Sequence, residues 1–335
     1  MPTHRGIFSS AFVVFDSFIF AASASTPFVH AFPYLGFIRT KYSNPASLPE
    51  GYSNSINLNS DKDTIAVSME VTPYVAAYGW SYLGWGSRFS DPATLPAGVS
   101  DGVGWLASSV VAVAHSTAPY ITVYPWSSGF GTKYANPATA VTTIGRDVVF
   151  NPAGDVIAVA VNSGAMPFNS YVWSSGFGTK YADPTGSAYN GKGLAFHPDG
   201  DAVAVASGSN GVGISAWAWS SGLGTKYSAP AVPNGDGYTV DFNPAGNTLI
   251  TSLRQSPYLS AWAWTSASGF GTKYSAAVSY PFASTYQGKF NQADDAIAIS
   301  SSIVRVYPFV VGTGFGTLQS TSGTTSGSTR GLSFI

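Results

Sequence analysis

The most informative scarcities in this sequence are those of cysteine and of charge. Cysteine is absent from the 335 residues, which excludes disulfides, thiolate metal sites and cysteine nucleophiles. Asp, Glu, Lys and Arg together make up 9% of the chain, whereas roughly 25% is usual in soluble domains. The formal net charge is −1, so the phosphate attraction on which nucleic-acid binding depends has no evident source. We therefore expect no nucleic-acid partner.

The sequence also lacks the local motifs of common enzymes. It contains no Gly-x-Ser-x-Gly elbow, no Walker loop and no His-Glu-x-x-His segment. Only two glutamates occur, Glu50 and Glu70, and the histidines are never at metal-ligand spacing from one another. His197 occupies a turn position that Asn151 holds in another segment, which favours a turn-capping role. We therefore predict no enzyme, no metal and no cofactor. A glycosidase whose two catalytic aspartates come from distant segments of the chain stays an open alternative.

Long hydrophobic runs are missing as well, and no stretch is long enough to span a membrane. The N-terminus is typical of a secretory signal, because Arg5 precedes an apolar stretch over residues 7–20 and small residues follow it. However, Asp16 interrupts that stretch, and residues 16–28 align with residues 63–74. We favour the interpretation that this segment is the first unit of a repeat.

That repeat is the most informative feature that the chain does have. The phrase Gly-Phe-Gly-Thr-Lys-Tyr is clearest at residues 129–134, 176–181 and 269–274, and weaker copies end at Tyr42, Phe89, Tyr227 and Gln319. Successive copies are 45 to 47 residues apart. A period this steady over the whole length indicates one array. We expect a single domain over residues 1–335, built from seven repeats of about 46 residues.

Within each repeat the apolar residues alternate with a period of two. Residues 156–160, 202–206 and 296–299 are predicted to be short strands of small residues. Turns in which Pro and Gly favour the required torsions precede them, as in residues 151–155. Four strands per repeat with no helix signal predict an all-β fold, a seven-bladed β-propeller of four-stranded blades.

The blades resemble those of the WD-repeat family. The segment Phe-His-Pro-Asp-Gly-Asp at residues 196–201 is similar to that family's turn, and Tyr-Val-Trp at residues 171–173 is similar to its third strand. Ser174 stands where the family usually has Asp, and the Gly-His pair before the inner strand is missing. The phrase Trp-Ser-Ser-Gly-Phe-Gly-Thr-Lys-Tyr also resembles repeat propeller proteins of marine tailed phages, which implies a virion location.

The two ends of the chain are expected to close the ring. Residues 331–335 match the inner strand at residues 193–197, and the turn and strand that should follow appear at residues 16–22. Pairing of these segments would remove two exposed sheet edges. Residues 12–15 compete for the same place in the first blade.

Two repeated sets of side chains are predicted to be structural. Large rings at one position of the third strand are expected to fill the wedges between blades. Basic residues on the outermost strand are expected to prevent edge-to-edge association, although a basic girdle for an anionic partner is the alternative. The rings are Tyr34, Trp80, Trp126, Trp173, Trp219, Trp264 and Phe309; the basic residues are Lys41, Arg88, Lys133, Lys180, Lys226 and Lys273.

The loops between the second and third strands are the predicted binding surface. A Pro-aromatic pair occupies this loop in five repeats, and the same face carries side chains that are peculiar to single repeats. Loops on a rigid scaffold are a common place for binding sites, whereas drift in exposed loops is the alternative explanation. The predicted ligand-binding residues are Phe28, Tyr74, Tyr120, Phe168, Tyr258, Glu70, His115 and Arg254; Arg146, Asn190, Lys192 and Asp236 are likewise peculiar to one repeat.

These observations predict a non-enzymatic phage virion protein, structural or for host attachment, that binds through one loop face. The alternatives are a lectin-like propeller that stacks sugars on its rings, or a general scaffold for protein partners. The expected partners are other virion proteins or a host-surface glycan, with no membrane insertion. The expected location is the virion or the extracellular space.

Overall fold

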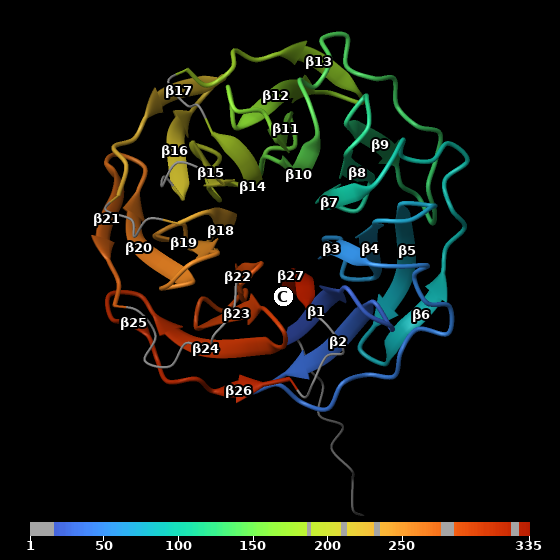
Figure 1. Cartoon of the computed structure of the whole chain (residues 1–335), viewed down its shortest axis with the longest axis horizontal. Helices are drawn as coiled ribbons and strands as arrows, with labels where there is room; N and C mark the ends of the chain where they lie inside the picture. Colours follow the sequence, from blue (N-terminus) through green and yellow to red (C-terminus); the bar gives the residue numbers. More distant parts are fainter. Residues whose placement is uncertain (1–16, 186–188, 209–212, 231–234, 276–284, 323–327) are drawn as a thin grey trace, which may run out of the picture.

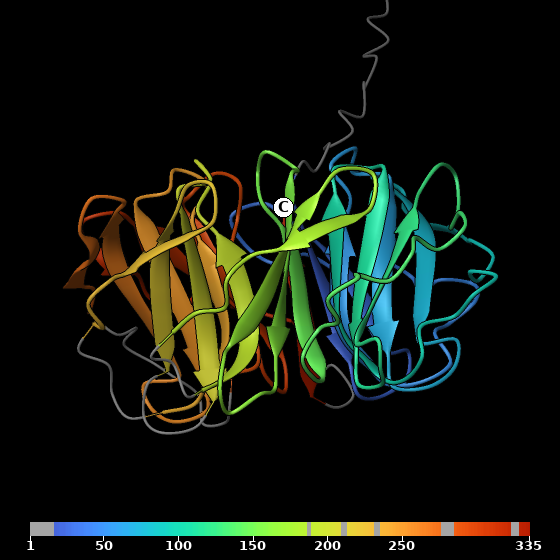
Figure 2. The ribbon, with the colours of Figure 1, turned by 90° about the horizontal axis from the view of Figure 1, so that it is seen from above.

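A computed structural model describes residues 17–185, 189–208, 213–230, 235–275, 285–322 and 328–335 of the protein. Seven antiparallel sheets surround a central channel as the blades of a propeller (Figure 1). Figure 2 shows the ring from its edge, with the strands of each blade running between the two faces. The described residues contain no helix. The predicted all-β, seven-bladed propeller is confirmed.

The first three blades contain the strands closest to the N-terminus, together with the last strand of the chain. In blade 1 and blade 3 an isolated bridge, Tyr34 to Ile38 and Trp126 to Phe130, lies in the place of the fourth strand. Blade 1 holds β27 (Thr329–Phe334), β1 (Ser17–Ser23) and β2 (Val29–Tyr34); blade 2 holds β3 (Ser53–Leu58), β4 (Thr64–Met69), β5 (Val75–Ser81) and β6 (Gly84–Arg88); blade 3 holds β7 (Ser100–Leu106), β8 (Val110–His115) and β9 (Ile121–Pro125).

The other four blades each contain at least four strands in chain order from the channel outward. Blade 4 holds β10 (Gly145–Phe150), β11 (Val156–Val161), β12 (Phe168–Trp173) and β13 (Phe177–Lys180); blade 5 holds β14 (Asn190–Phe196), β15 (Ala202–Gly208), β16 (Ile214–Trp219) and β17 (Leu223–Lys226). Blade 6 holds β18 (Gly237–Phe242), β19 (Thr248–Leu253), β20 (Leu259–Thr265) and β21 (Gly269–Lys273); blade 7 holds β22 (Gly288–Phe290), β23 (Ala296–Ser300), β24 (Val304–Val310), β25 (Gly314–Phe315) and β26 (Ser320–Thr321).

In five of the seven blades, a side-chain cap fixes the turn before the second strand. In blade 4 the Asn151 side-chain oxygen accepts the N–H groups of Asp155 and Val156, each at 3.0 Å. The Asn151 amide donates to the Asp155 carboxylate at 2.7 Å. Because the side chain satisfies N–H groups that begin the next strand, the turn and the strand start are specified together. In blade 5 His197 replaces the asparagine and reaches the next blade through Gly246.

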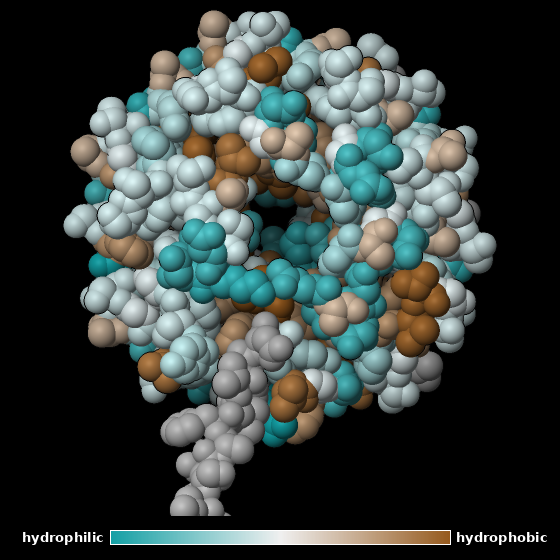
Figure 3. All heavy atoms as spheres, turned by 180° about the vertical axis from the view of Figure 1, so that it is seen from behind, coloured by the Kyte–Doolittle hydropathy of each residue, from teal (hydrophilic) through white to brown (hydrophobic). Residues whose placement is uncertain are grey.

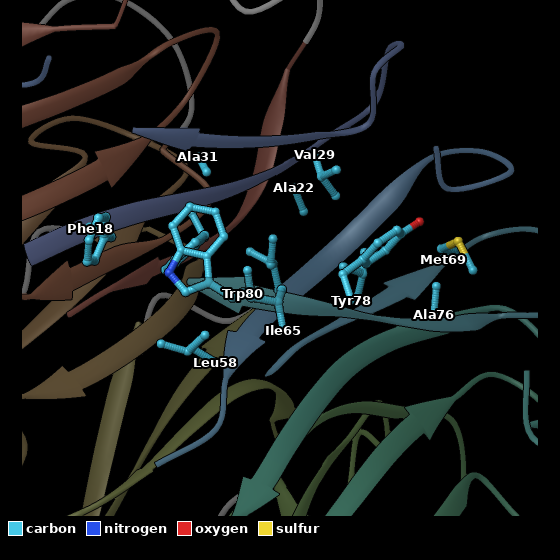
Figure 4. Packing of buried hydrophobic residues seen from close by; sticks show 13 residues of the cluster. Phe18, Ala22, Val29, Ala31, Leu58, Ile65, Met69, Ala76, Tyr78 and Trp80 are labelled. Carbon is cyan, nitrogen blue, oxygen red and sulfur yellow. The ribbon is translucent and has the colours of Figure 1, made fainter. Parts of the chain in front are cut away.

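Large rings fill the wedges between neighbouring blades, as predicted. Trp173 is 3% exposed and makes edge-to-face contacts with Tyr134, Phe150 and Phe177 at centroid distances of 5.2 to 5.5 Å. Figure 4 shows the corresponding cluster around Trp80, where residues of blade 1 meet residues of blade 2. Such pairs add to the burial of apolar surface that holds adjacent sheets together.

Blade 1 closes the ring by the predicted pairing. β27 takes the innermost place and pairs with β1, with Phe334 opposite Ile19 and Leu332 opposite Ala21. Phe18 and Ile335 exchange two backbone hydrogen bonds of 2.9 and 3.0 Å. Residues 12–15, which competed for this place, lie outside the described residues, as does the apolar part of the apparent signal before residue 17. No described segment forms a helix long and apolar enough to cross a membrane.

Candidate functional site

One position of the innermost strands supplies a ring of side chains at one mouth of the channel. In five blades it lies four residues before the end of the inner strand, whereas in β7 it lies five residues before the end and in blade 7 it precedes β22. A β-bulge interrupts the pairing with the second strand near this position in most blades. A bulge redirects a side chain out of the regular alternation. The mouth ring, one residue from each of blades 1 to 7, is Arg330, Asn54, Asp101, Arg146, Lys192, Tyr238 and Tyr286, and all seven line one cavity of about 340 Å³.

Ion pairs organise the acidic side of the mouth ring. Arg146 donates to Asp101 at 2.6 Å, and Arg330 donates to Glu70 at 2.5 Å and to the side-chain oxygen of Asn54 at 2.8 Å. Burial raises the pKa of Asp101, and the Arg146 guanidinium opposes that rise. These contacts hold two guanidinium groups at fixed positions beside the cavity.

Lys192 adds a third cation and lies against an aromatic ring. Its ammonium is 4.2 Å from the centroid of Tyr238 and 3.8 Å from the Asp236 carboxylate. Burial lowers the pKa of Lys192; Asp236 opposes this change, while Arg254 and Arg146 add to it. Gly208 leaves room for the lysine, because a Cβ at that position would lie 2.4 Å from the Lys192 Cε.

Tyr238 and Tyr286 form an aromatic side of the same cavity. Their ring centroids are 5.5 Å apart at an interplanar angle of 51°. A cavity with cations on one side and rings on another suits a ligand that has a polar or charged group and an apolar C–H face. The cavity volume lies near the lower end of the roughly 300–1,000 Å³ of small-ligand sites.

The next residue of each inner strand forms a second ring, the waist, between the mouth and the deeper part of the channel. Four polar side chains of this waist, Ser55, Asp147, Thr239 and Gln287, line both the mouth cavity and a second cavity deeper in the channel. The other three positions are glycines: Gly102, Gly193 and Gly331. Each of these glycines lies against the inner strand of the next blade, where a Cβ would come within 2.7 to 2.8 Å of a backbone Cα.

Asp147 is the waist residue with the most unusual chemistry. Its two carboxylate oxygens accept the N–H groups of Val148 and Leu194, each at 2.9 Å. Desolvation raises the pKa of Asp147 to about 6, although both hydrogen bonds and the charge of Lys289 act in the opposite direction. A carboxylate with a pKa near neutrality is suited to accept a proton from a reacting group.

The Pro-aromatic loops do not converge on this cavity. Phe28, Tyr74, Tyr120 and Tyr258 are partly buried, and all four have positive φ angles between 61° and 69° after a cis proline. Phe168 is different, because it is 1% exposed and packs edge-to-face on Trp217 in the core between blades 4 and 5. Its assignment to the exposed loop surface is therefore corrected.

The other three predicted residues have three different environments. Glu70 reaches the mouth ring through its ion pair with Arg330. Arg254 is exposed and contributes to the electrostatics of Lys192 and Tyr238. His115 is fully buried, its Nε2 lies 2.9 Å from the Thr122 hydroxyl, and burial lowers its pKa to about 4. It therefore does not face a ligand.

A second group of potential ligand atoms lies at the turn of blade 5. Atoms of His197, Asp199 and Asp201 lie within 4.8 Å of one another. The two ring nitrogens of His197 already have protein neighbours, because Nδ1 is 2.8 Å from Asp201 and Nε2 is 2.8 Å from the Gly246 carbonyl oxygen. This geometry agrees with the turn-capping role expected for His197.

Sequence reasoning missed the mouth ring as a site. In the sequence, Arg146 and Lys192 are peculiar to one repeat. Nothing in the sequence places them beside Asp101, Tyr286 or Arg330. The available signal was the alignment of the inner strands. Each ring residue precedes by four a large residue at or next to the end of the strand, such as Phe150, and the residue type changes in almost every repeat. The seven positions are one repeat apart in sequence, so no local motif contains them.

The chain matches no model of a known protein family and no curated protein. Solved structures do share its fold. A proposed 6-phosphogluconolactonase from Bacteroides uniformis is 13% identical with a TM-score of 0.73, covering 95% of this chain and 99% of its own. The periplasmic gluconolactonase of Pseudomonas aeruginosa is 15% identical with a TM-score of 0.70, also covering 95% of this chain and 99% of its own. At these identities the likeness establishes a common fold.

These neighbours contradict the predicted function. They are named for a lactonase activity, not for a virion or host-attachment role, so the prediction of a non-enzymatic phage propeller is wrong. Low charge and absent local motifs argued against an enzyme, whereas the polar groups of a propeller converge from separate blades and leave no motif in the sequence.

Proposed function

We propose that this protein is a lactone hydrolase whose active site is the cavity at the mouth of the channel. The observation that carries the proposal is the convergence of Arg146, Lys192 and Arg330 above Asp147 in one cavity. The lactonase names of the structural neighbours support the choice of reaction. The substrate class that fits is a hydroxylated lactone. Among the charged groups that line the cavity, three cations outnumber the two carboxylates, Asp101 and Asp147, which favours a substrate that carries a negatively charged group.

Asp147 is the general base of the proposed reaction. Water attacks the lactone carbonyl carbon and gives up a proton to the Asp147 carboxylate. A base with a pKa of about 6 is ionised at neutral pH and still accepts a proton effectively. The hydrogen bonds from Val148 and Leu194 fix the orientation of the carboxylate while leaving lone pairs for the water.

The cations of the mouth ring stabilise the oxyanion that forms at the carbonyl. Arg146 and Lys192 come from adjacent blades and are held by Asp101 and Asp236. Fixed positive charge at the position where negative charge develops lowers the barrier. When the tetrahedral intermediate collapses, the ring C–O bond breaks, the leaving oxygen takes the proton from Asp147, and the product is the open-chain hydroxy acid.

The test measures hydrolysis of D-glucono-1,5-lactone, with and without a 6-phosphate, against the uncatalysed rate at pH 7. We expect catalysis by the native chain and a preference for the phosphorylated lactone. Lys192→Met is expected to lower kcat/KM about 100-fold, the loss typical of removing one oxyanion-stabilising group. A native rate equal to the uncatalysed rate with both lactones would overturn the proposal.

Lys133→Met is the matched control for this experiment. Lys133 lies outside the channel, on the segment after the third strand of blade 3, where it donates to Asn136 at 2.6 Å. The substitution removes the same charge and the same side chain without touching the cavity. We expect an unchanged kcat/KM, and an equal loss in both variants would indicate an effect of net charge.

Three finer predictions from the sequence stay proposals. The first is the resemblance of the blades to WD repeats, since the structural neighbours support the propeller fold alone. An extracellular location agrees with the periplasmic neighbour, and secretion of the full chain would test it. Host-surface glycans and other virion proteins as partners are tested by none of these observations.

A further inference from the structure

A second cavity continues the channel below the waist. Its volume is about 310 Å³, and it shares Ser55, Asp147, Thr239 and Gln287 with the mouth cavity. Figure 3 shows the ring from the side opposite to Figure 1, with a central opening bordered by hydrophilic and hydrophobic residues. The two cavities are therefore consecutive compartments of one channel.

The side chains of the lower compartment divide into a polar part and an apolar part. They lie three residues after the mouth ring on each inner strand. Blades 6, 7, 1 and 2 contribute Asp241, Lys289, Ser333 and Asn57, whereas blades 3, 4 and 5 contribute Gly104, Val149 and Ala195. The four polar side chains and Val149 line the cavity.

An ion pair between Lys289 and Asp241 dominates the polar part. The Lys289 ammonium donates to Asp241 at 2.7 Å, and the other Asp241 oxygen accepts the Phe290 N–H at 3.0 Å. Burial acts to lower the pKa of Lys289, but Asp241 and Asp147 raise it on balance, so the ammonium stays charged. The pair is partly exposed, at 32% for the Lys289 side chain and 17% for that of Asp241, so both groups stay accessible from the cavity.

The polar part retains unused hydrogen-bonding capacity. Within the described residues, Lys289 donates one of its three N–H groups to a protein acceptor. The Asn57 side-chain amide and the Ser333 hydroxyl have no hydrogen-bond partner among the described groups, and both line the cavity. One wall of the cavity therefore offers both donors and acceptors, which match the hydroxyl groups of a sugar.

The charges that line the lower compartment favour a different ligand from those that line the mouth. Asp147 and Asp241 outnumber the single cation Lys289, so the lower compartment does not favour a second anionic group. Val149 on the opposite wall suits the C–H face of a sugar ring. The mouth cavity, by contrast, is lined by three cations, Arg146, Lys192 and Arg330, which outnumber its two carboxylates, Asp101 and Asp147.

We propose that the lower compartment is a subsite for a neutral sugar unit attached to the lactone, so that the substrate is the lactone of a disaccharide acid. The lactone unit occupies the mouth above Asp147, and the attached sugar passes the waist and bonds Lys289, Asp241 and Asn57. The assignment of the lactone end rests on the proposed function. The subsite itself is defined by the cavity and its polar wall.

The test compares the binding of lactobionate, a gluconate that carries one neutral sugar, with the binding of gluconate alone by titration calorimetry. The native chain is expected to bind lactobionate at least 10-fold more tightly. Asn57→Leu is expected to reduce this ratio to about one while leaving the affinity for gluconate unchanged, and Lys289→Met is expected to reduce the ratio as well. Asn57→Leu disturbs no ion pair, so it tests the subsite even if Lys289→Met fails to fold.

Equal native affinities, no binding of lactobionate, or an advantage that persists in Asn57→Leu would each overturn the proposal. Lys192→Met in the mouth should weaken both ligands equally and keep their ratio. Hydrolysis of gluconolactone is measured separately. A chain that keeps the affinity ratio but hydrolyses no lactone would contradict the proposed reaction while supporting the subsite.

Discussion

At the scale of single residues, Asp147 combines a cost in stability with a chemical use. Its pKa of about 6 in the folded chain exceeds the ordinary value near 3.9, so the folded state binds more protons than the unfolded chain between these pH values. Stability from this group is therefore present at acidic pH and is lost as the pH rises through 6. The ionised carboxylate is the form that the proposed reaction needs.

Asp147→Asn is expected to remove the loss of stability that Asp147 causes as the pH rises, and to abolish activity. The free energy of unfolding of the variant relative to the native chain should rise by about 2 kcal/mol between pH 4 and pH 8, since two pKa units correspond to about 2.7 kcal/mol. A cost that is independent of pH adds to this change, because Asn offers one acceptor oxygen to the two N–H groups of Val148 and Leu194. Loss of a general base should lower kcat about 100-fold or more. Urea unfolding across this pH range checks the first effect, and a stability difference that is independent of pH would contradict it.

The pKa shift of His115 has the opposite effect on the pH dependence of stability. Burial lowers its pKa to about 4, below the unfolded value of 6.5, so its contribution to stability is complete above pH 6.5 and is lost as the pH falls toward 4. His30 behaves in the same way, with burial lowering its pKa to about 4.

His115→Gln is therefore expected to flatten the loss of stability in acid. The native chain should lose about 3 kcal/mol through this one group between pH 6.5 and 4, a contribution that the variant lacks. Denaturant unfolding at several pH values measures the slope. A variant whose slope equals that of the native chain would show that His115 is not a buried neutral imidazole.

At the scale of elements, the inner strands pack by pairing a glycine with a larger residue of the next blade. Gly102 in β7 lies against Asp147 in β10, and Gly193 in β14 lies against Thr239 in β18. Asp147 and Thr239 in turn accept backbone N–H groups of the following blades, from Leu194 and Gly288. The waist is thus built from close backbone approach and from side-chain contacts between blades.

Gly102→Ala is expected to destabilise the protein by about 1–3 kcal/mol, the usual cost of overpacking. The added Cβ would meet the Asp147 Cα at 2.7 Å and the Arg146 carbonyl oxygen at 2.9 Å, and neither backbone atom yields cheaply. Displacement of Asp147 should also lower activity.

Gly164→Ala is the matched control, because a Cβ there would have no atom within 4 Å. Its free energy of unfolding is expected to stay within about 0.5 kcal/mol of the native value. Equal losses in the free energy of unfolding of the two variants would show that the effect comes from the lost flexibility of glycine and not from the contact between β7 and β10.

At the scale of the whole molecule, closure depends on the last strand. β27 fills the inner place of blade 1 and also contacts β3 of the next blade, where a Cβ at Gly331 would lie 2.7 Å from the Ser55 Cα. Removal of residues 328–335 would expose the edge of β1 and take Arg330 from the mouth ring. An unpaired edge invites association with other chains.

A chain that ends at residue 327 is therefore expected to lose its cooperative unfolding transition and to aggregate. A circular permutant that joins residue 335 to residue 17 and opens the chain at Gly164 keeps every described strand and should unfold as the native chain does. Calorimetry and size-exclusion chromatography distinguish the two. A soluble, cooperatively folded truncated chain would show that blade 1 closes without β27.

Local chemistry explains why so much of the fold could be predicted. The period of 45 to 47 residues, the alternation within β11 and β15, and the Asn151 turn are properties of short segments. The match of residues 331–335 to an inner strand was enough to predict closure, because each blade needs such a strand. The large rings such as Trp173 were placed correctly since they recur at one position of every repeat.

The candidate site was decided by the tertiary structure. Arg146, Lys192 and Arg330 belong to three different blades and meet because the ring closes and because bulges aim them into the channel. Burial, which the sequence does not specify for single loop residues, placed Phe168 and His115 in the core. The sequence by itself determined the repeat, the strands and the ring, because these follow from local patterns. The tertiary structure decided the convergence of charged groups and the raised pKa of Asp147, because both depend on contacts between blades that exist only in the closed molecule.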